Sequence, residues 1–125
     1  MRDLRFRAWD KEMGEMLQIG QITFAPNCDR FEQAYLMDEH NDIHYLDDVE
    51  IMQYTGLEDK HGTPIFEGDI VNHPDLGKKE VEFVGGAFVL KGDGVNFTGK
   101  LLFSECEVIG NKWEGCKCET THQQD

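Results

Sequence analysis

Short runs of alternating apolar and polar residues, broken by glycine, asparagine, aspartate or proline, make up most of this chain. Thirteen glycines are spread over the 125 residues, and no stretch keeps a helical period of about 3.6 residues. The alternation is clearest at 79–84 and 87–91, and the Gly85-Gly86 pair between these runs suits a two-residue hairpin. This pattern predicts a mainly β domain, either a small barrel or two packed antiparallel sheets with one or two helical turns.

Further strands are expected along most of the chain. Residues 4–8 and 16–19 alternate in the same way, and Gly14 between them can supply the positive φ that a short hairpin loop needs. Turn-forming residues at 38–42 favour a strand, a turn and a returning strand over 34–46. The other short runs are 22–24, 50–55, 64–66, 70–72 and 106–109, and 101–103 is apolar enough for a core segment.

The length of the chain suits one domain, because folding at this size buries roughly two-thirds of the surface that the unfolded chain exposes. We expect a single domain over 1–125. A loop at 74–77 offers a division into an N-terminal part, 1–73, and an SH3-like barrel part, 64–112. The polar tail, 114–125, is expected to fray.

The formal net charge is −13, and it is unevenly placed along the chain. Residues 29–69 hold twelve acids against two bases, a local sum of −10. Such a segment repels phosphate backbones, and the only basic cluster is Arg2, Arg5 and Arg7, so we expect no binding of nucleic acid. Solubility is the simplest explanation of the acidity; attraction to a basic protein or mimicry of nucleic acid are the alternatives.

The four cysteines are too few and too unevenly spread for a disulfide framework, and no secretory signal precedes them. We expect free thiols in a reducing cytoplasm. No stretch approaches the roughly 18 uncharged apolar residues of a membrane span, so no membrane association is expected.

Three parts of the sequence can be compared with a known family. They are LRFRAWD at 4–10, MQYTGL at 52–57 running through DKHG at 59–62 to IFEGDIV at 65–71, and CEVIGN at 106–111. In this order they resemble the YopX family of small proteins from bacterial phages and prophages. The resemblance covers nearly the whole chain, but the tail departs from it, since WEGCKC follows where family members often have a Tyr-Glu-Asn-Pro-like segment.

The resemblance implies a β pseudo-barrel with short helical caps, a phage or prophage origin and self-association into a homo-oligomer. It implies no known activity. Function must therefore be argued from candidate sites on the fold.

Three carboxylates are candidates for a metal-assisted hydrolase or nuclease site. Asp59, Glu67 and Asp69 offer the oxygen ligands that Mg²⁺ and Ca²⁺ prefer, although their spacing matches no calcium loop. The alternative, which we favour, is that Gly68 makes a tight turn while the carboxylates accept hydrogen bonds from backbone N–H groups. The sequence thus indicates no metal site here.

A second candidate binding site is the polar end of a strand at Gln53, Tyr54 and Thr55, whose polar tips could line a pocket. Tyr54 could equally be a core residue with a hydrogen-bonded hydroxyl. Arg5 and Arg7 alternate with aromatic residues, and we favour an edge strand protected by charge over a stacking surface for bases.

Cysteines and histidines give no clear site. Cys116, Cys118 and His122, with Cys106, could hold zinc, but the spacing departs from the usual pairs, and simple surface thiols are favoured. His40 and His44 are four residues apart, but a strand, a turn and a returning strand would not bring their side chains together. For His61 and His73, the sequence names no residue that could orient the imidazole ring as a base.

No catalytic set and no cofactor motif can be found, so catalytic residues are unknown and no cofactor is expected. The favoured hypothesis is a non-enzymatic interaction module that self-associates and presents its acidic face to a basic host or phage protein. The alternatives are the enzyme using Asp59, Glu67 and Asp69, and an acidic DNA mimic.

Overall fold

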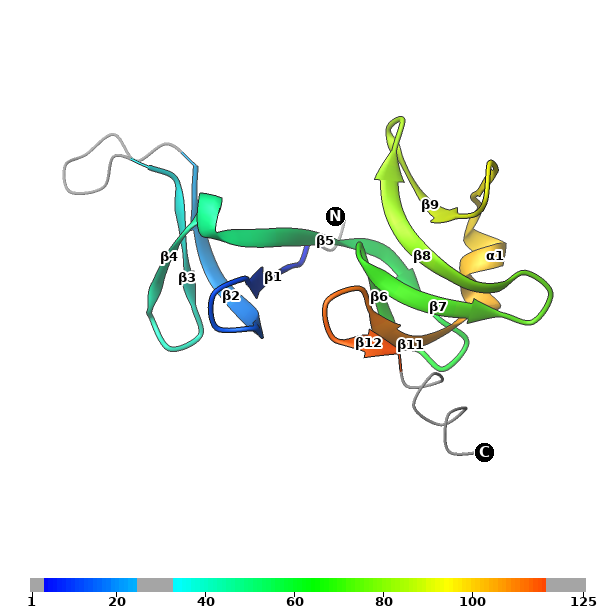
Figure 1. The fold of residues 1–125 in the computed structure, drawn as a ribbon, viewed down its shortest axis with the longest axis horizontal. Helices are drawn as coiled ribbons and strands as arrows, with labels where there is room; N and C mark the ends of the chain where they lie inside the picture. The colour runs from blue at the N-terminus through cyan, green and yellow to red at the C-terminus, as the bar shows by residue number, and fades with distance from the viewer. Residues whose placement is uncertain (1–3, 25–32, 117–125) are drawn as a thin grey trace. The chain divides into compact units, whose positions relative to one another are not determined.

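The computed structural model describes residues 4–24 and 33–116, and these residues fold mainly into antiparallel β-strands (Figure 1). A first six-stranded sheet has the spatial order β4-β3-β2-β1-β5-β6. Its strands, in chain order, are β1 (Phe6–Asp10), β2 (Glu15–Thr23), β3 (Tyr35–Asp38), β4 (Ile43–Tyr45), β5 (Val49–Glu58) and β6 (Pro64–Phe66).

The second six-stranded sheet has the order β10-β9-β8-β7-β11-β12. Two short helical segments, η1 (Leu46–Asp48) and α1 (Lys100–Ser104), connect strands. The strands of this sheet are β7 (Asp69–His73), β8 (Gly77–Val84), β9 (Ala87–Lys91), β10 (Asn96–Phe97), β11 (Glu107–Asn111) and β12 (Gly115–Cys116).

The predicted fold class, a mainly β chain with two antiparallel sheets and short helical segments, is confirmed. The hairpin around Gly14 forms as expected, with that residue at φ +69°. Some details differ. Residues 22 and 23 belong to β2 instead of forming a separate strand, β5 runs on past residue 55 to Glu58, and the core segment 101–103 is helical. No helix in the described part of the chain is long and apolar enough to cross a membrane.

The contacts divide the chain into two compact units, which we call the N-terminal unit (from Arg5 to Gln53) and the C-terminal unit (from Tyr54 onward, together with Leu4). The expected division into parts 1–73 and 64–112 stays a prediction. The core of the N-terminal unit is built from Ala8, Leu17, Leu36 and Val49, one residue from each of four strands.

The strand β1 lies inside the first sheet, paired with β2 on one side and β5 on the other. The expectation that Arg5 and Arg7 protect an edge strand is therefore wrong. Ala8 at the middle of β1 has no exposed surface. Its small side chain fits a strand that is covered by neighbours on both sides. The alternation of apolar and polar residues in the sequence could not distinguish a central strand from an edge strand.

In the C-terminal unit, the core joins β6 to the second sheet and to α1. Each fully buried aliphatic or aromatic side chain of this kind contributes about 1.5–3 kcal/mol to the free energy of unfolding. α1 contributes one buried residue and leaves Leu101 73% exposed. The buried residues of this core are Ile65, Val71, Val81, Leu90, Phe103 and Cys106.

Candidate functional site

The predicted polar strand end at Gln53, Tyr54 and Thr55 lies on β5, and two of these side chains have structural roles. Tyr54 is buried and its ring packs against Phe66, with the centroids 5.5 Å apart. The Thr55 hydroxyl donates to the Ile65 carbonyl at 2.8 Å and accepts from a backbone N–H at 3.1 Å. Gln53 is half-buried. A binding role for these three residues stays a prediction.

Asp59 is 6% exposed, and both of its carboxylate oxygens accept backbone hydrogen bonds. Oδ1 accepts from His61 N at 2.8 Å and from Thr63 N at 2.9 Å, and Oδ2 accepts from Val108 N at 2.9 Å. Burial by itself raises the pKa of Asp59, but these three N–H donors outweigh it and hold the pKa below its usual value. The carboxylate thus joins its own turn to β11.

The turn at Gly68 leads from β6 into β7. Gly68 has φ +89°, and Asp69 Oδ2 accepts from Phe66 N at 2.8 Å. Asp69 is 2% exposed and Glu67 is half-buried. Within residues 4–24 and 33–116, no three His, Cys, Asp or Glu side chains are grouped so that they could hold a metal ion, and this includes the predicted set of Asp59, Glu67 and Asp69.

Of the cysteines, Cys106 and Cys116 lie in the described residues, and both are buried free thiols, so the expectation of surface thiols is wrong for them. Burial, followed by the nearby carboxylates of Glu105 and Asp59, raises the pKa of Cys106 to about 11. Its Sγ donates to the Leu102 carbonyl at 3.2 Å. The predicted ligands Cys118 and His122, like Cys28, lie outside the described residues.

His73 is 3% exposed and is tied down at both ring nitrogens. Nδ1 accepts from Asp75 N at 3.0 Å and Leu76 N at 3.2 Å, so the ring proton lies on Nε2, which donates to Glu105 Oε1 at 2.8 Å. The sequence could name no partner for His73, because Glu105 is distant along the chain. This histidine joins the end of β7 to the residue that follows α1.

The most developed candidate site lies in the N-terminal unit, where His44 on β4 stands between two buried aspartates. His44 Nε2 donates to Asp38 Oδ2 at 2.9 Å, and His44 Nδ1 lies 3.7 Å from Asp10 Oδ2. Asp10 and Asp38 are each 7% exposed. The imidazole is therefore fixed between the end of β1 and the end of β3, two points that the chain separates by 28 residues.

Each of these aspartates also begins a hairpin turn, which explains why it is held so firmly. Asp10 Oδ1 accepts from Glu12 N at 3.0 Å and Met13 N at 3.1 Å. Asp38 Oδ1 accepts from His40 N at 2.8 Å and Asp42 N at 3.0 Å. Aspartate is common in such turns because its short side chain reaches the backbone two residues on. One carboxylate oxygen thus builds the turn and the other faces His44.

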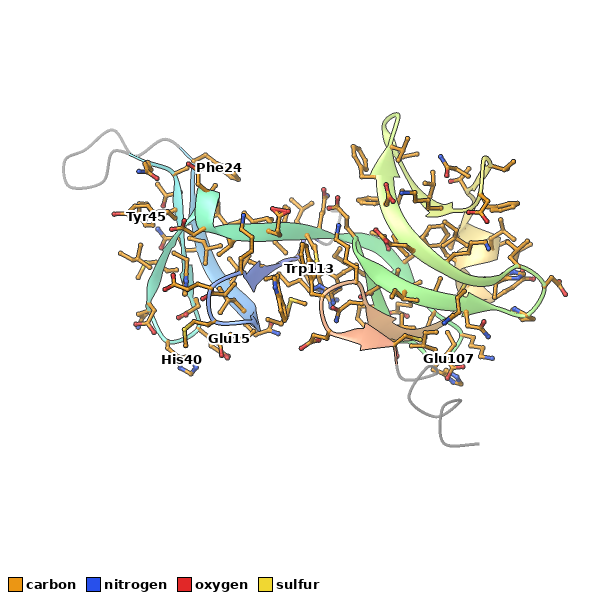
Figure 2. The ribbon with its side chains drawn as sticks, viewed as in Figure 1. Glu15, Phe24, His40, Tyr45, Glu107 and Trp113 are labelled. Carbon is orange, nitrogen blue, oxygen red and sulfur yellow. The ribbon has the colours of Figure 1, made fainter. Side chains whose placement is uncertain are left out.

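A pocket of about 410 Å³ opens over this arrangement. Three apolar side chains, Met13, Met16 and Leu17, line part of it. The lining also includes two histidines and five carboxylates but no lysine or arginine, so its electrostatic character is strongly negative. Figure 2 shows Glu15 and His40, two of the polar residues, at the same end of the unit. The five carboxylates are Asp10, Glu15, Asp38, Glu39 and Asp42.

The hydrogen bond from His44 is the main cause that lowers the pKa of Asp38 below its usual value. Burial acts in the opposite direction, and the backbone N–H groups of Asp42 and His40 add to the lowering. Asp38 is therefore a carboxylate at neutral pH. It orients the imidazole and fixes which ring nitrogen faces Asp10.

This site is not among those predicted from the sequence. The strand, turn and strand over 34–46 is confirmed. His40 is 76% exposed at its side chain and lines the same pocket as His44. What sequence reasoning did not find was the partner of His44. An aspartate at the start of both hairpin turns was a usable signal, because adjacent antiparallel hairpins bring their turns to one end of a sheet.

Comparisons with known proteins support the fold. The structure is similar to the crystal structure of protein EF1440 from Enterococcus faecalis, with a TM-score of 0.64 and 24% sequence identity over 91% of this chain and 96% of that chain. No curated protein sequence matches this chain. The family model described as YopX protein matches residues 5–117, nearly the whole chain. The chain therefore belongs to the YopX family.

Proposed function

We propose that this chain is a non-enzymatic interaction module, encoded by a phage or prophage, that binds a basic protein in the cytoplasm of a bacterial host cell. The observation that carries the proposal is the distribution of exposed charge between the two units. The missing metal-holding group among the described residues supports a binding role over the metal-assisted enzyme.

The N-terminal unit exposes seven acids and two bases within its described residues, whereas the C-terminal unit exposes five of each. Electrostatic attraction to a basic surface raises association rates and selects partners by charge. Among the described residues, the net exposed negative charge thus lies on the N-terminal unit. We call the seven residues the acidic surface: Glu12, Glu15, Glu39, Asp42, Asp47, Asp48 and Glu50.

The test is affinity capture of the tagged protein from a bacterial lysate, followed by identification of the retained proteins. Reversing charge with Asp47→Lys, Asp48→Lys and Glu50→Lys should abolish capture of basic proteins. The control reverses three exposed acids of the C-terminal unit, Glu58, Asp75 and Asp93, which changes the net charge equally but leaves the acidic surface intact. Circular dichroism establishes that both variants fold.

Salt separates the outcomes further. Raising the ionic strength from about 0.1 M to about 1 M shortens the Debye length from about 10 Å to about 3 Å, so the partner should be released. Equal loss of capture by both triple variants would show that only net charge matters and would contradict the proposal. Retained proteins that are displaced by duplex DNA would favour the alternative, an acidic DNA mimic.

The proposal includes self-association. Phe83 and Val84, at the end of β8, are 52% and 43% exposed, and the Phe83 ring packs edge-on against Phe88 with centroids 4.9 Å apart. Adjacent exposed apolar side chains of this kind mark contact surfaces more often than isolated ones. A second copy of the chain is the occupant that we propose for this hairpin.

A further inference from the structure

We infer that the turn between β7 and β8, residues 74–76, is a proton-sensitive element that is released when His73 takes up a proton. The inference goes beyond the proposed function and does not depend on it. His73 Nδ1 accepts hydrogen bonds from Asp75 N at 3.0 Å and Leu76 N at 3.2 Å, and Nε2 donates to Glu105 Oε1 at 2.8 Å. Nδ1 can accept these bonds only while the ring is neutral and carries its proton on Nε2.

Other turns of the chain are held by the same arrangement, but with an oxygen as the acceptor. Asn111 Oδ1 accepts from Trp113 N at 3.0 Å and Glu114 N at 2.9 Å, the groups two and three residues further on. Asp10 Oδ1 accepts in the same pattern. His73 places a ring nitrogen in this position, and histidine is the side chain that ordinarily changes charge between pH 5 and 8. The β7–β8 turn is therefore held by an acceptor that mild acid can remove.

Protonation at Nδ1 turns this acceptor into a third donor that faces two backbone N–H groups. Both hydrogen bonds to the turn are then lost, and the freed N–H groups need water or another acceptor. Asp75 is exposed, so the turn can move toward solvent. Nε2 carries a proton in the neutral and in the charged ring, so its bond to Glu105 persists and keeps the buried His73 ring in place. The turn moves, and the ring does not.

Charged and titratable groups reach His73 from each element that packs against it. Glu105 contacts the ring directly, and Asp75 belongs to the turn itself. Lys79 on β8 pairs with the residue two positions before His73, so it lies on the same face of β7. Cys106 is a neutral thiol over this pH range, because burial raises its pKa to about 11. Three charged residues of the same elements are placed differently: Lys78 on β8 and Glu107 on β11, which pair with Asn72 and point to the opposite face, and Lys100 at the start of α1.

The test is NMR of the full chain, labelled with ¹⁵N, at about pH 7.5 and about pH 5.5, on either side of the range in which histidine ordinarily titrates. Long-range ¹H–¹⁵N spectra should show His73 protonated on Nε2 alone at the higher pH and on both nitrogens at the lower pH. Over the same change, the protection of the Asp75 and Leu76 amides against exchange should fall roughly ten-fold, as for loss of one hydrogen bond each. The internal control is the turn held by Asn111, whose two N–H groups should keep their protection.

His73→Asn is the matched variant, because it replaces the ring nitrogen by the amide oxygen that Asn111 uses in its own turn. In this variant the Asp75 and Leu76 amides should keep the same protection at both pH values. Should the loss of the bond to Glu105 prevent the variant from folding, the comparison of the two turns in the parent protein still decides.

Several results would overturn the inference. One is a proton on Nδ1 of His73 at the higher pH, and another is a ring that stays neutral at the lower pH. A third is a protonated ring with unchanged protection of Asp75 and Leu76. Equal loss of protection at the turn held by Asn111 would show global unfolding and would reject a local release, as would the same pH dependence in His73→Asn.

Discussion

Three aspartates, Asp10, Asp38 and Asp59, begin turns in the same way and differ in what their second oxygen does. In each aspartate, Oδ1 accepts hydrogen bonds from two backbone N–H groups of the turn. Oδ2 of Asp59 accepts from Val108 N, Oδ2 of Asp38 accepts from His44, and Oδ2 of Asp10 faces the pocket. The same local motif thus serves a structural link, an oriented histidine and a candidate binding site.

This difference predicts different costs for the same substitution. Asn keeps Oδ1, so the turn survives, but its amide group cannot accept the bond that Oδ2 accepts. Asp59→Asn should lower the free energy of unfolding by about 1–3 kcal/mol, because the buried Val108 N–H loses its acceptor. Asp10→Asn is the matched control and should cost less, which urea denaturation of both variants at neutral pH can measure. An equal loss in the free energy of unfolding for Asp59→Asn and Asp10→Asn would contradict the structural role given to Asp59 Oδ2.

The lowered pKa values of Asp38 and Asp59 predict how stability depends on pH. A carboxyl whose pKa is lower in the folded than in the unfolded state stabilises the fold fully above its unfolded value and loses that contribution as pH falls through the folded value. For both residues the usual value is 3.8, so the melting temperature should fall as pH drops below about 4. Asp59→Asn should show a shallower fall. An equally steep fall in the variant would contradict the contribution of Asp59.

Cys106 is predicted to be unreactive in the folded protein. Burial keeps its pKa at about 11, and the thiolate is the form that reacts. Iodoacetamide treatment at pH 8, followed by digestion and mass spectrometry, should leave the peptide with Cys106 unmodified in buffer and modified in urea. Rapid modification of Cys106 in buffer would show that this core opens readily.

At the scale of elements, the β8–β9 hairpin depends on two glycines with positive φ, Gly85 at +59° and Gly86 at +87°. A side chain at Gly86 would meet no atom within 4 Å, so the cost of a substitution is conformational alone. Gly86→Ala should lower the free energy of unfolding by about 1–2 kcal/mol. Gly20→Ala is the control, because Gly20 has no positive φ and its added Cβ would make ordinary contacts of 3.5 Å; its effect should stay within about 0.5 kcal/mol. A similar cost at both positions would reject the conformational explanation.

The elements were mostly predictable from the sequence, and the errors have local causes. The Gly85-Gly86 pair and the turn-forming residues indicated the hairpins well, because turn conformations depend on a few neighbouring residues. The segment 101–103 was not identified as a helix, since α1 has only five residues and shows no full helical period. The central place of β1 in its sheet depends on strand partners that are distant along the chain.

At the scale of the whole molecule, the uneven exposed charge of the described residues in the two units and the exposed apolar hairpin bear on assembly. If Phe83 and Val84 mediate self-association, Phe83→Ser should shift the mass measured by light scattering toward that of the monomer, 14.4 kDa. Val95→Ser is the control, because Val95 is 58% exposed but lies outside this hairpin. A monomeric parent protein, or an equal effect of both substitutions, would reject the hairpin as the contact between copies.

The sequence alone determined the mainly β class, most strand positions, the hairpin turns and the family, because alternation, turn residues and motif order are local or linear properties. Only the tertiary structure decided which side chains meet. Asp10, Asp38 and His44 come together because two hairpins lie side by side in one sheet, and Asp59 reaches Val108 across 49 residues. Strand pairing between distant segments sets such contacts, and no short-range pattern in the sequence records it.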